Sequence, residues 1–417
     1  MDSFEAGLWH GARMIDSRGA LEAVIRHAVE LEDDYDDIAP TVTALAASGD
    51  ITVVPQLREA LDRFLDEENF YGRDLIAGVL AGIDGVAALP ALLRASARDL
   101  GDDQDSLQAE IIELLQAHRA AGRRTVIECV TGNTPELRRV GLWALGFVAE
   151  AQDIELLTTA SVDSDSKVRS MAIGSLPNPA TNDRALEVLV TALSDVDEQV
   201  RVAAVSSLSA ATGRADAVAP LAALADDQSA RVRTMAAYTL GRIGSDAATP
   251  VLLRLLQDTD RHVRERSVEA LGSIGGEAAV DTLLTLAADE DPDLRVQAAK
   301  ALAKAADSDP RVTLQLTALA RDDEASVRAA TISGLASSGT RRSHFAQILI
   351  ELTDDPAPMV RQRIAVVVRG LATDTARSIL RRYANDTDPS VRRLASTELD
   401  RFDVGRSESQ PPTESGL

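Results

Sequence analysis

The sequence is short of the residues that form disulfides, aromatic pockets and basic surfaces. Its 417 residues include one cysteine, Cys129, which excludes an internal disulfide and suits a reducing, cytoplasmic location. Cys129 lies in the apolar segment 126–130, so we expect it to be a small buried hydrophobe. Only 3% of the residues are aromatic, which argues against a pigment-sized aromatic pocket.

Basic residues are outnumbered by acidic residues, 43 to 66, and the formal net charge is −23. Only three of the basic residues are lysines, namely Lys167, Lys300 and Lys304. Because nucleic-acid binding requires a continuous basic face, this charge predicts that the chain binds no nucleic acid. We also expect no signal peptide and no apolar run near the roughly 20 residues of a membrane span, so membrane insertion is not predicted.

Motifs for catalysis, cofactors and metals are missing as well. The five histidines are scattered without ligand spacing: His10, His27, His118, His262 and His344. No serine or cysteine lies in a nucleophile motif, and the glycines of 272–276 are read as a helix end rather than a phosphate loop. The sequence therefore predicts no catalytic, cofactor-binding or metal-binding residues and a protein that is not an enzyme.

What the chain does contain is a repeat with a period near 32 residues. In each repeat an arginine follows an aspartate after six positions, and successive arginines lie 31 to 33 residues apart. The eight pairs are Asp163 and Arg169, Asp195 and Arg201, Asp227 and Arg233, Asp258 and Arg264, Asp289 and Arg295, Asp322 and Arg328, Asp355 and Arg361, and Asp386 and Arg392. A fixed period of this length without strand patterning predicts stacked helix pairs.

The unit 215–244 illustrates the helix pair. Apolar residues recur at three- and four-residue steps in both halves, so each helix has one apolar stripe. The short polar side chains of 226–229 separate the halves and can cap the second helix. Neither helix can bury its stripe alone, so the pairs must stack on one another. The sequence thus predicts an all-α fold, a right-handed α-solenoid of stacked antiparallel helix pairs.

The regularity of the repeat divides the chain into three parts. Residues 102–402 are predicted to form the regular array, although Gln108 stands at an arginine position and Gly132 at an aspartate position. Residues 1–101 are predicted to be irregular helical repeats that cap the array. Residues 403–417, which are polar and contain prolines, are predicted to be a disordered tail.

The aspartates and arginines recur once per repeat, which predicts a structural ladder along the stack. The planar guanidinium would reach a carboxylate or a carbonyl of its own turn or of the adjacent turn. A row of anion sites and a row of metal-binding carboxylates are the alternatives. We favour the ladder because a residue needed in every repeat serves what every repeat needs.

These features resemble the HEAT-like superfamily, specifically the short-period repeats first associated with phycobilin lyases. The resemblance is carried by the Asp–Arg ladder and by the helix endings 240–244 and 271–275, and it covers about 134–399. Deoxyhypusine hydroxylases of this superfamily bind two irons through His-Glu steps, whereas no histidine of this chain precedes a glutamate. Alkylpurine DNA glycosylases with similar helices need a basic, tryptophan-lined cleft, and Trp9 and Trp143 lie far apart in sequence.

Positions that vary between repeats mark the surface that is free to bind a partner. Five residues after the ladder arginines come Gly174, Ser206, Tyr238, Glu269, Lys300, Ser333, Val366 and Thr397. This position is expected to face outward on the second helix, which lines the concave surface of similar solenoids. The predicted partner-binding residues are Tyr238, Arg242, Glu269, Lys300 and Lys304, because tyrosine and arginine favour interface hot spots. Chance surface variation is the alternative.

The aromatic residues mark a second candidate surface. Eight of the twelve fall before Val148: Phe4, Trp9, Tyr35, Phe64, Phe70, Tyr71, Trp143 and Phe147. An irregular N-terminal third with most of the large side chains is suited to specific docking. The alternative, which we prefer, is that these side chains fill a less regular cap.

Together these features predict a non-enzymatic scaffold or adaptor that binds other proteins and needs no cofactor. The Asp-rich, Arg-over-Lys composition is similar to that of salt-loving archaea, whose HEAT-like proteins are known in taxis. The resemblance therefore implies a haloarchaeal cytoplasm and, at its narrowest, taxis signalling between a response regulator and the archaellum motor. The alternative is a lyase-like modifying enzyme, or an enzyme-accessory or assembly factor on the same solenoid.

Overall fold

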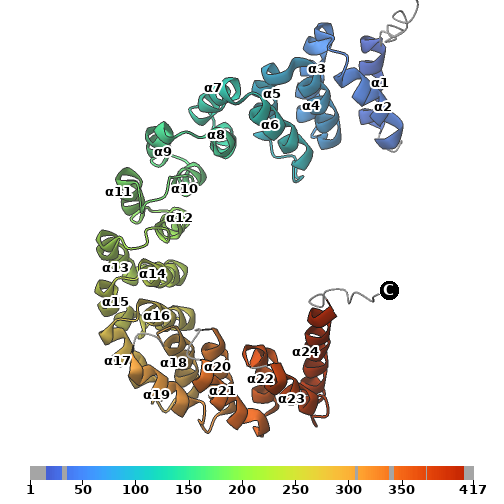
Figure 1. Ribbon diagram of the computed structural model, residues 1–417. Helices are drawn as coiled ribbons and strands as arrows, with labels where there is room; N and C mark the ends of the chain where they lie inside the picture. The colour runs from blue at the N-terminus through green and yellow to red at the C-terminus, as the bar shows by residue number, and fades with distance from the viewer. Residues whose placement is uncertain (1–15, 31–34, 306–308, 338–341, 372, 408–417) are drawn as a thin grey trace, which may run out of the picture. The chain divides into compact units, whose positions relative to one another are not determined.

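The computed structural model describes residues 16–30, 35–305, 309–337, 342–371 and 373–407. Helices fill nearly all of these ranges, and no strand occurs within them (Figure 1). The chain divides into two compact units, Met1–Pro177 and Asn178–Leu417. The prediction of an all-α fold is confirmed.

The first unit contains ten α-helices in the described ranges. They are α1 (Ser17–Glu30), α2 (Tyr35–Ala46), α3 (Val54–Asp66), α4 (Phe70–Asp84), α5 (Leu89–Ser96), α6 (Asp105–Ala117), α7 (Arg119–Val130), α8 (Pro135–Val148), α9 (Ile154–Ala160) and α10 (Ser166–Gly174). Short 3-10 turns, η1 (Ile51–Val53), η2 (Gly85–Ala88) and η3 (Ala151–Asp153), lead into α3, α5 and α9. The second helices α4, α6, α8 and α10 pack on one another in that order.

The second unit repeats the pair more regularly. Its helices are α11 (Asp183–Ala192), α12 (Glu198–Leu208), α13 (Val218–Ala223), α14 (Ala230–Ile243), α15 (Thr249–Leu255), α16 (Arg261–Ile274), α17 (Glu277–Leu286), α18 (Pro292–Lys304), α19 (Pro310–Leu319), α20 (Ala325–Ser337), α21 (Arg342–Glu351), α22 (Pro358–Val367), α23 (Thr373–Tyr383) and α24 (Pro389–Ser407). The 3-10 turns are η4 (Ala215–Ala217), η5 (Leu224–Asp226), η6 (Asp246–Ala248), η7 (Leu352–Asp354) and η8 (Val368–Gly370).

Within this second unit the even-numbered helices from α12 to α24 form one continuous stack. The odd-numbered helices α13 to α21 cover the other side of that stack (Figure 1). This arrangement is an α-solenoid, in which each pair buries its apolar stripes against its neighbours. The predicted right-handed sense of the stack stays a prediction.

Short polar side chains set where the second helices begin. Asp197 caps α12, Ser229 caps α14 and Asp260 caps α16, each by accepting hydrogen bonds from the first backbone N–H groups of its helix. At the other end, Gly244 terminates α14 and Gly275 terminates α16, with φ angles of +72° and +68°. The polar break within each repeat is therefore a helix start, as the unit 215–244 predicted.

Glycine and alanine let the second helices of the array approach closely. A Cβ atom on Gly241 of α14 would lie 2.8 Å from the Cα atom of Ala270 on α16. One repeat further, a Cβ atom on Gly272 would lie 2.8 Å from the Cα atom of Ala301 on α18. Since no larger residue fits, these glycines hold the surfaces of α14, α16 and α18 side by side.

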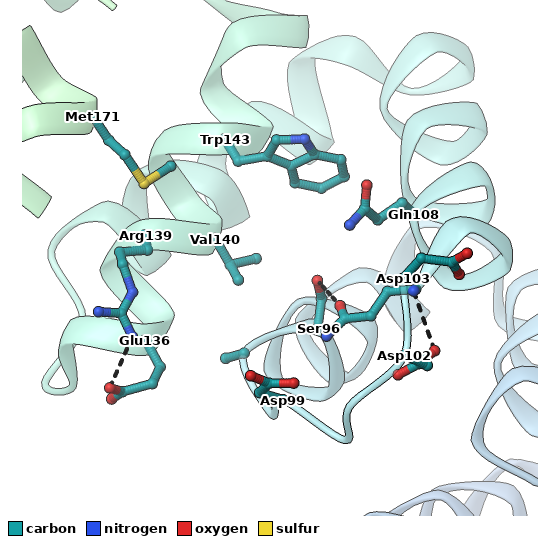
Figure 2. Close-up of a pocket in the computed structure, with 12 residues that line it drawn as sticks. Ser96, Asp99, Asp102, Asp103, Gln108, Glu136, Arg139, Val140, Trp143 and Met171 are labelled. Atoms are coloured by element: carbon teal, nitrogen blue, oxygen red, sulfur yellow. Dashed lines mark hydrogen bonds and ion pairs between the residues drawn. The ribbon is translucent and has the colours of Figure 1, made fainter. Parts of the chain in front are cut away.

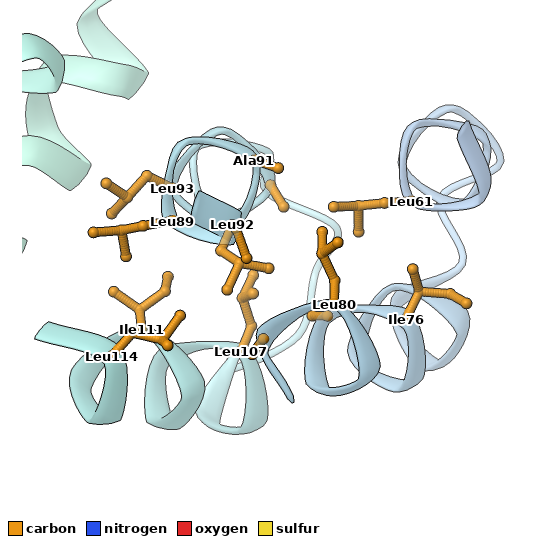
Figure 3. Close-up of a cluster of buried hydrophobic side chains, with 14 of the residues drawn as sticks. Leu61, Ile76, Leu80, Leu89, Ala91, Leu92, Leu93, Leu107, Ile111 and Leu114 are labelled. Carbon is orange, nitrogen blue, oxygen red and sulfur yellow. The ribbon is translucent and has the colours of Figure 1, made fainter. Parts of the chain in front are cut away.

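The core of the first unit depends on larger side chains. Figure 3 shows Leu61 of α3, Ile76 and Leu80 of α4, Leu92 of α5 and Ile111 of α6 as parts of one layer of side chains between these helices. All five are at most 1% exposed. Burying a leucine or isoleucine contributes roughly 1.5–3 kcal/mol, so this cluster is a main source of the unit's stability.

One helical stretch of this unit corrects the expectation about apolar runs. Phe70–Ser96 is long and apolar enough to cross a membrane by length and composition, and the pair Tyr35–Ala46 and Ile51–Asp66 passes the same test only with a 109° bend. In the protein, 56% of the apolar window of Phe70–Ser96 is buried. Gly85, with φ +57°, breaks the stretch between α4 and α5. The stretch Phe70–Ser96 is therefore long and apolar because it contains two consecutive core helices, α4 and α5.

The predicted division at residues 101 and 102 concerns repeat regularity and stays a prediction, whereas the compact units divide after Pro177. The predicted tail 403–417 needs correction at its start, because α24 continues to Ser407. Residues 1–15 and 408–417 lie outside the described residues.

Candidate functional site

A ladder arginine can join two neighbouring repeats, as Arg201 illustrates. Its Nη1 atom donates to the carbonyl oxygen of Asp195, in its own repeat, at 2.9 Å. Its Nε and Nη2 atoms donate to the two carboxylate oxygens of Asp227, in the next repeat, at 2.7 and 3.0 Å. The Asp227 carboxylate also accepts from the backbone N–H of Ser229, the residue that caps α14. One arginine thus ties its own turn to the next helix start.

The same bidentate contact, which we call a rung, recurs along the second unit. The other rungs are Arg233–Asp258, Arg295–Asp322, Arg328–Asp355 and Arg361–Asp386. The sequence left open whether the arginine reaches its own turn or the adjacent one. In the structure its Nη1 atom bonds the carbonyl of its own turn, and its other nitrogens bond the carboxylate of the next.

The rungs are shielded from solvent and strongly polarised. In the Arg328–Asp355 rung the side chains are 11% and 3% exposed. The hydrogen bond from Arg233 lowers the pKa of Asp258, and that from Arg361 lowers the pKa of Asp386. These carboxylates are ionised acceptors already occupied by an arginine. That arrangement favours the structural ladder over rows of metal or anion sites.

Two positions that depart from the repeat are the two ends of one missing rung. Gln108 takes the arginine position in α6, and Gly132 takes the aspartate position of the next repeat. Because a rung joins the arginine of one repeat to the aspartate of the next, a repeat without the arginine needs no aspartate after it. A Cβ atom on Gly132 would lie 2.9 Å from the carbonyl oxygen of Cys129 in the same turn, which leaves little room for a side chain at this position.

Arginine–aspartate contacts between neighbouring repeats occur on both sides of this missing rung in the first unit. Arg138 donates to the carbonyl oxygen of Gly132 at 3.1 Å and to one carboxylate oxygen of Asp163 at 2.7 Å, and its Nε atom lies 2.7 Å from the other oxygen. Arg73, which is fully buried, donates to both carboxylate oxygens of Asp102 at 3.0 and 2.5 Å. The ladder therefore extends on both sides of the gap.

One further rung is incomplete in the array itself. Within the part of the chain that the structure describes, Arg264 donates only to the carbonyl oxygens of Asp258 and Thr259. Asp289, the expected acceptor, accepts only the hydrogen bond from the backbone N–H two residues later that Asp227 also accepts. The sequence, in which all eight pairs look alike, does not distinguish this repeat.

The predicted partner-binding residues lie together on α14, α16 and α18. Tyr238, Arg242, Glu269 and Lys304 line one cavity of about 440 Å³. Lys300 lines an adjacent cavity of about 420 Å³, and Glu269 borders both. The position five residues after the ladder arginine is exposed in six repeats and half-buried at Glu269 and Ser333.

Arg266, which the sequence analysis missed, connects these side chains. Its guanidinium carbon lies 5.5 Å from the ring centroid of Tyr238, and its Nη1 atom donates to Oε2 of Glu269 at 2.5 Å. The Nζ atom of Lys304 lies 3.6 Å from the other carboxylate oxygen of Glu269. We call the six residues Tyr238, Arg242, Arg266, Glu269, Lys300 and Lys304 the α14–α18 patch. Arg266 lies two positions after Arg264, where the repeats also vary, so the same comparison at that position would have found it.

The N-terminal aromatics divide between filling and lining roles. Phe64 is completely buried and fills the first unit, whereas Phe70 is 50% exposed. Tyr71 hydrogen-bonds to His27 at 2.8 Å. Trp143 packs edge-to-face on Phe147, with ring centroids 5.3 Å apart, and lines a separate cavity. Phe4 and Trp9 lie outside the described residues.

That cavity, which we call the α6–α8 pocket, has a volume of about 410 Å³ (Figure 2). Its lining residues are Ser96, Ala97, Asp99, Asp102, Asp103, Gln104, Gln108, Glu136, Arg139, Val140, Trp143 and Met171. Figure 2 shows the indole of Trp143 on one side, and Asp99, Asp102 and Asp103 along the opposite side. The pocket therefore combines an aromatic wall with an acidic one.

Other reactive groups offer little chemistry. Cys129 is buried, as predicted, and burial raises the pKa of its thiol to about 11, which leaves the thiol unreactive near neutral pH. Among the residues that the structure describes, no group of three or more His, Cys, Asp or Glu side chains is placed to hold a metal ion.

Solved structures with this arrangement of helices are large solenoids. Yeast importin-β (Kap95p) aligns with a TM-score of 0.61 at 16% identity, covering 96% of this chain and 62% of the importin chain. Kap121p aligns with a TM-score of 0.54 at 13% identity, covering 92% and 49%. This chain thus spans about half to two thirds of the length of those proteins, and the likeness concerns the fold alone.

The CpcE–CpcF complex of phycocyanin lyase from Nostoc sp. PCC7120 aligns with a TM-score of 0.36 at 20% identity, covering 60% of this chain and 94% of that chain. A score this low carries no structural argument. No curated protein matches the chain in sequence. The family model for HEAT repeats does, over the overlapping segments 124–209, 159–240, 186–272, 219–303 and 254–336. These segments cover 124–336, half of the chain, and the chain belongs to the HEAT-repeat family.

Proposed function

We propose that this chain is a non-enzymatic, cytoplasmic scaffold that binds another protein through the α14–α18 patch. One observation carries the proposal. Four of the five residues predicted from the sequence, Tyr238, Arg242, Glu269 and Lys304, come from three helices and yet line one cavity, and the fifth, Lys300, lines the adjacent one. Residues that vary for no reason would be spread over the surface, whereas residues that recognise a partner need to be adjacent.

The chemistry of the patch fits an acidic partner surface. Four of its residues, Arg242, Arg266, Lys300 and Lys304, are basic in a chain of net charge −23. The acidic remainder of the surface repels a negatively charged partner, so local positive charge steers such a partner to this place. Tyr238, which is 36% exposed, offers the partner an aromatic surface beside these charges.

The patch is also partly ordered before any partner binds. Glu269 bonds Arg266 on one side and lies near Lys304 on the other, so one carboxylate positions two cations. Arg266 in turn lies over the ring of Tyr238. Side chains that are already held in place lose less conformational freedom on binding, which favours affinity.

The narrowest form of the proposal is an adaptor between a taxis response regulator and the archaellum motor. It rests on the haloarchaeal likeness of the composition and of the repeat, and on nothing in the patch itself. An enzyme-accessory or lyase-like role is the competing proposal. A stoichiometric metal or chromophore in the purified protein would favour that competitor.

The test is an affinity capture with mass spectrometry from native lysate at molar salt. The patch variant carries Arg242→Ser, Lys300→Ser and Lys304→Ser. The matched control carries Arg254→Ser, Arg311→Ser and Arg321→Ser, which removes the same charge from exposed residues away from the second helices. We expect one protein with an acidic surface to be captured by the wild type and the control, and lost with the patch variant.

Capture of a response regulator or motor protein in that pattern would support the taxis form of the proposal. Equal capture by the patch variant and the control would reject the α14–α18 patch as the docking surface. Circular dichroism of both variants shows whether they are equally folded, since surface ion pairs contribute only about 0–1 kcal/mol each.

A further inference from the structure

We propose that the α6–α8 pocket binds an arginine side chain from an extended segment of a partner protein, at the point where the ladder lacks an arginine of its own. This site lies in the first unit and is independent of the α14–α18 patch. The argument rests on the unused hydrogen-bond acceptors of the pocket, on its aromatic wall and on its charge.

The acceptors are the backbone carbonyls that ladder arginines normally use. In eight repeats the arginine Nη1 atom donates to the carbonyls five and six residues before it: Arg169, Arg201, Arg233, Arg264, Arg295, Arg328, Arg361 and Arg392. The equivalent carbonyls before Gln108 belong to Asp102 and Asp103, which both line the pocket. No described residue donates a hydrogen bond to either carbonyl. Carbonyl pairs that elsewhere in the chain hold a guanidinium are thus available here.

The loop that carries these carbonyls is fixed in its conformation by its own hydrogen bonds. Gln104 has a left-handed φ of +59°, and its side chain bonds Ser96 and the carbonyl of Arg98. Asp102 is bonded by the buried Arg73, which anchors the loop from behind. The acceptors therefore need little rearrangement to receive a donor.

The opposite wall of the pocket suits a flat cation. Trp143 contributes an indole face, and a guanidinium stacks on tryptophan more effectively than an ammonium group does. Asp99 and Asp103 are exposed at the other wall, and neither forms an ion pair with any residue that the structure describes. A guanidinium between these walls would bond the carbonyls or carboxylates at its edge while its face covers the indole. Lysine, a compact point charge, would satisfy only one of these contacts at a time.

Two apolar residues favour a peptide segment over a free small cation. Val140 and Met171 line the pocket beside Trp143, on α8 and α10, and both are only half-buried. A peptide on either side of the bound arginine would cover them, whereas a free guanidinium would leave them in water. Burial of such surface stabilises binding by about 25 cal/mol per Å².

The pocket supplies its own reporter, because the chain has only two tryptophans, Trp9 and Trp143. The full-length Trp9→Phe variant leaves Trp143 as the single tryptophan. Its emission is titrated with a capped seven-residue peptide that has one central arginine flanked by leucines. Two control peptides replace the arginine by citrulline, which keeps the shape without the charge, or by lysine. We expect a saturable change with the arginine peptide and at least about fivefold weaker binding of both controls.

Matched variants separate the pocket from the general negative charge of the chain. Asp99→Asn with Asp103→Asn removes two charges in the pocket, and Asp62→Asn with Asp323→Asn removes two exposed charges elsewhere. The pocket pair should weaken the arginine peptide at least about fivefold, and the distant pair less than about twofold. Equal weakening by both pairs, or an equal response to the citrulline peptide, would overturn the proposal.

Gln108→Arg supplies the missing arginine within the chain and gives an independent check. If the carbonyls of Asp102 and Asp103 are the binding site, this substitution occupies them and abolishes the response to the peptide. Gln108→Met, which has similar length without a cation, should leave the response within about twofold of the parent. Unchanged peptide binding in the arginine variant would place the ligand elsewhere and refute the assignment.

Discussion

The array from α12 to α24 and the junction between α6 and α8 are built from the same repeat, yet they differ in one contact. In the array an arginine bonds its own turn and the aspartate of the next repeat, as in Arg201 and Asp227. At the junction Gln108 and Gly132 replace both partners, and a pocket with free backbone carbonyls lies beside Gln108. The difference teaches that the Asp–Arg pair belongs to the interface between two repeats and not to either repeat alone.

The comparison also bears on what a rung does. Where rungs are closed, arginines occupy the carbonyls and the carboxylates, as Arg201 does. Where the rung is absent, the equivalent carbonyls of Asp102 and Asp103 receive no hydrogen bond from a described residue, and both residues line a pocket. A repeat that gives up a stabilising contact can thereby gain a recognition site.

The largest expected effect comes from opening a buried rung. Arg328→Ala leaves the Asp355 carboxylate, whose side chain is 3% exposed, without its cation. Breaking a buried ion pair from one side costs about 3–5 kcal/mol because the remaining charge stays desolvated. We therefore expect a loss of about 3 kcal/mol in the unfolding free energy of the array, measured as a shift of the urea midpoint followed by circular dichroism.

The incomplete rung provides the control for that substitution. Arg264 bonds only two carbonyls among the described residues, so Arg264→Ala strands no buried carboxylate. A loss of about 1 kcal/mol is expected, the usual size for neutral acceptors that water can reach. Equal losses in the two variants would contradict the view that the carboxylate bond is the stabilising part of a rung.

A second prediction uses pH to isolate the carboxylate bond. The hydrogen bond from Arg233 holds the pKa of Asp258 below its ordinary value. A carboxyl group with a lowered folded-state pKa stabilises the protein fully above its unfolded pKa of about 3.9, and loses that contribution as pH falls through the folded pKa. Wild type should exceed Asp258→Asn by about 2 kcal/mol at pH 7. That difference should shrink steadily below about pH 4, measured by urea unfolding at each pH.

Asp323→Asn is the control for the pH series, because Asp323 is exposed and no described residue bonds its carboxylate. Its difference from wild type should stay within about 0.5 kcal/mol at every pH. A difference for Asp258→Asn that grew as pH fell would reverse the sign of the argument and show that the carboxylate opposes folding.

The period of the sequence was enough to predict the fold. Apolar stripes at three- and four-residue steps require helices, and a stripe that one helix cannot bury requires the next pair. The sequence did not predict which arginine bonds each aspartate carboxylate. Asp227, for example, lies six residues before Arg233 and 26 residues after Arg201. Both spacings recur with the same period, so only the fold decides which arginine reaches the carboxylate.

The candidate sites show the same limit. Comparison of the repeats found Tyr238 and Lys304 because surface positions vary where core positions do not. It did not predict that Glu269 would also lie near Lys304, since that contact depends on how closely Gly272 lets α16 approach α18. Similarly, the sequence showed Gln108 and Gly132 as two separate exceptions to the repeat. Only the contact between Arg201 and Asp227 shows that the two positions are the partners of a single missing rung.

The smallest expected effect comes from rebuilding the missing rung. Gly132→Asp alone should destabilise the first unit, because its Cβ atom would lie 2.8 Å from Leu137 and 2.9 Å from the carbonyl of Cys129. Gln108→Arg alone should stabilise the first unit by no more than about 1 kcal/mol, because the new guanidinium would bond two backbone carbonyls as Arg264 does. Together the two residues can form the bidentate contact, so a double-mutant cycle should give a favourable coupling of about 1 kcal/mol.

The sign of that coupling matters more than the net stability of the double variant. The strain at residue 132 is present in both variants that carry the aspartate, so the cycle cancels it and leaves the contact between residues 108 and 132. The matched cycle with Gln108→Arg and Gly132→Asn retains the strain without the charge, and its coupling should be smaller because an amide oxygen is a neutral acceptor and cannot form the bidentate ion pair. Equal couplings in the two cycles would mean that the new residues meet without forming a rung. The two exceptions in the sequence would then be unrelated.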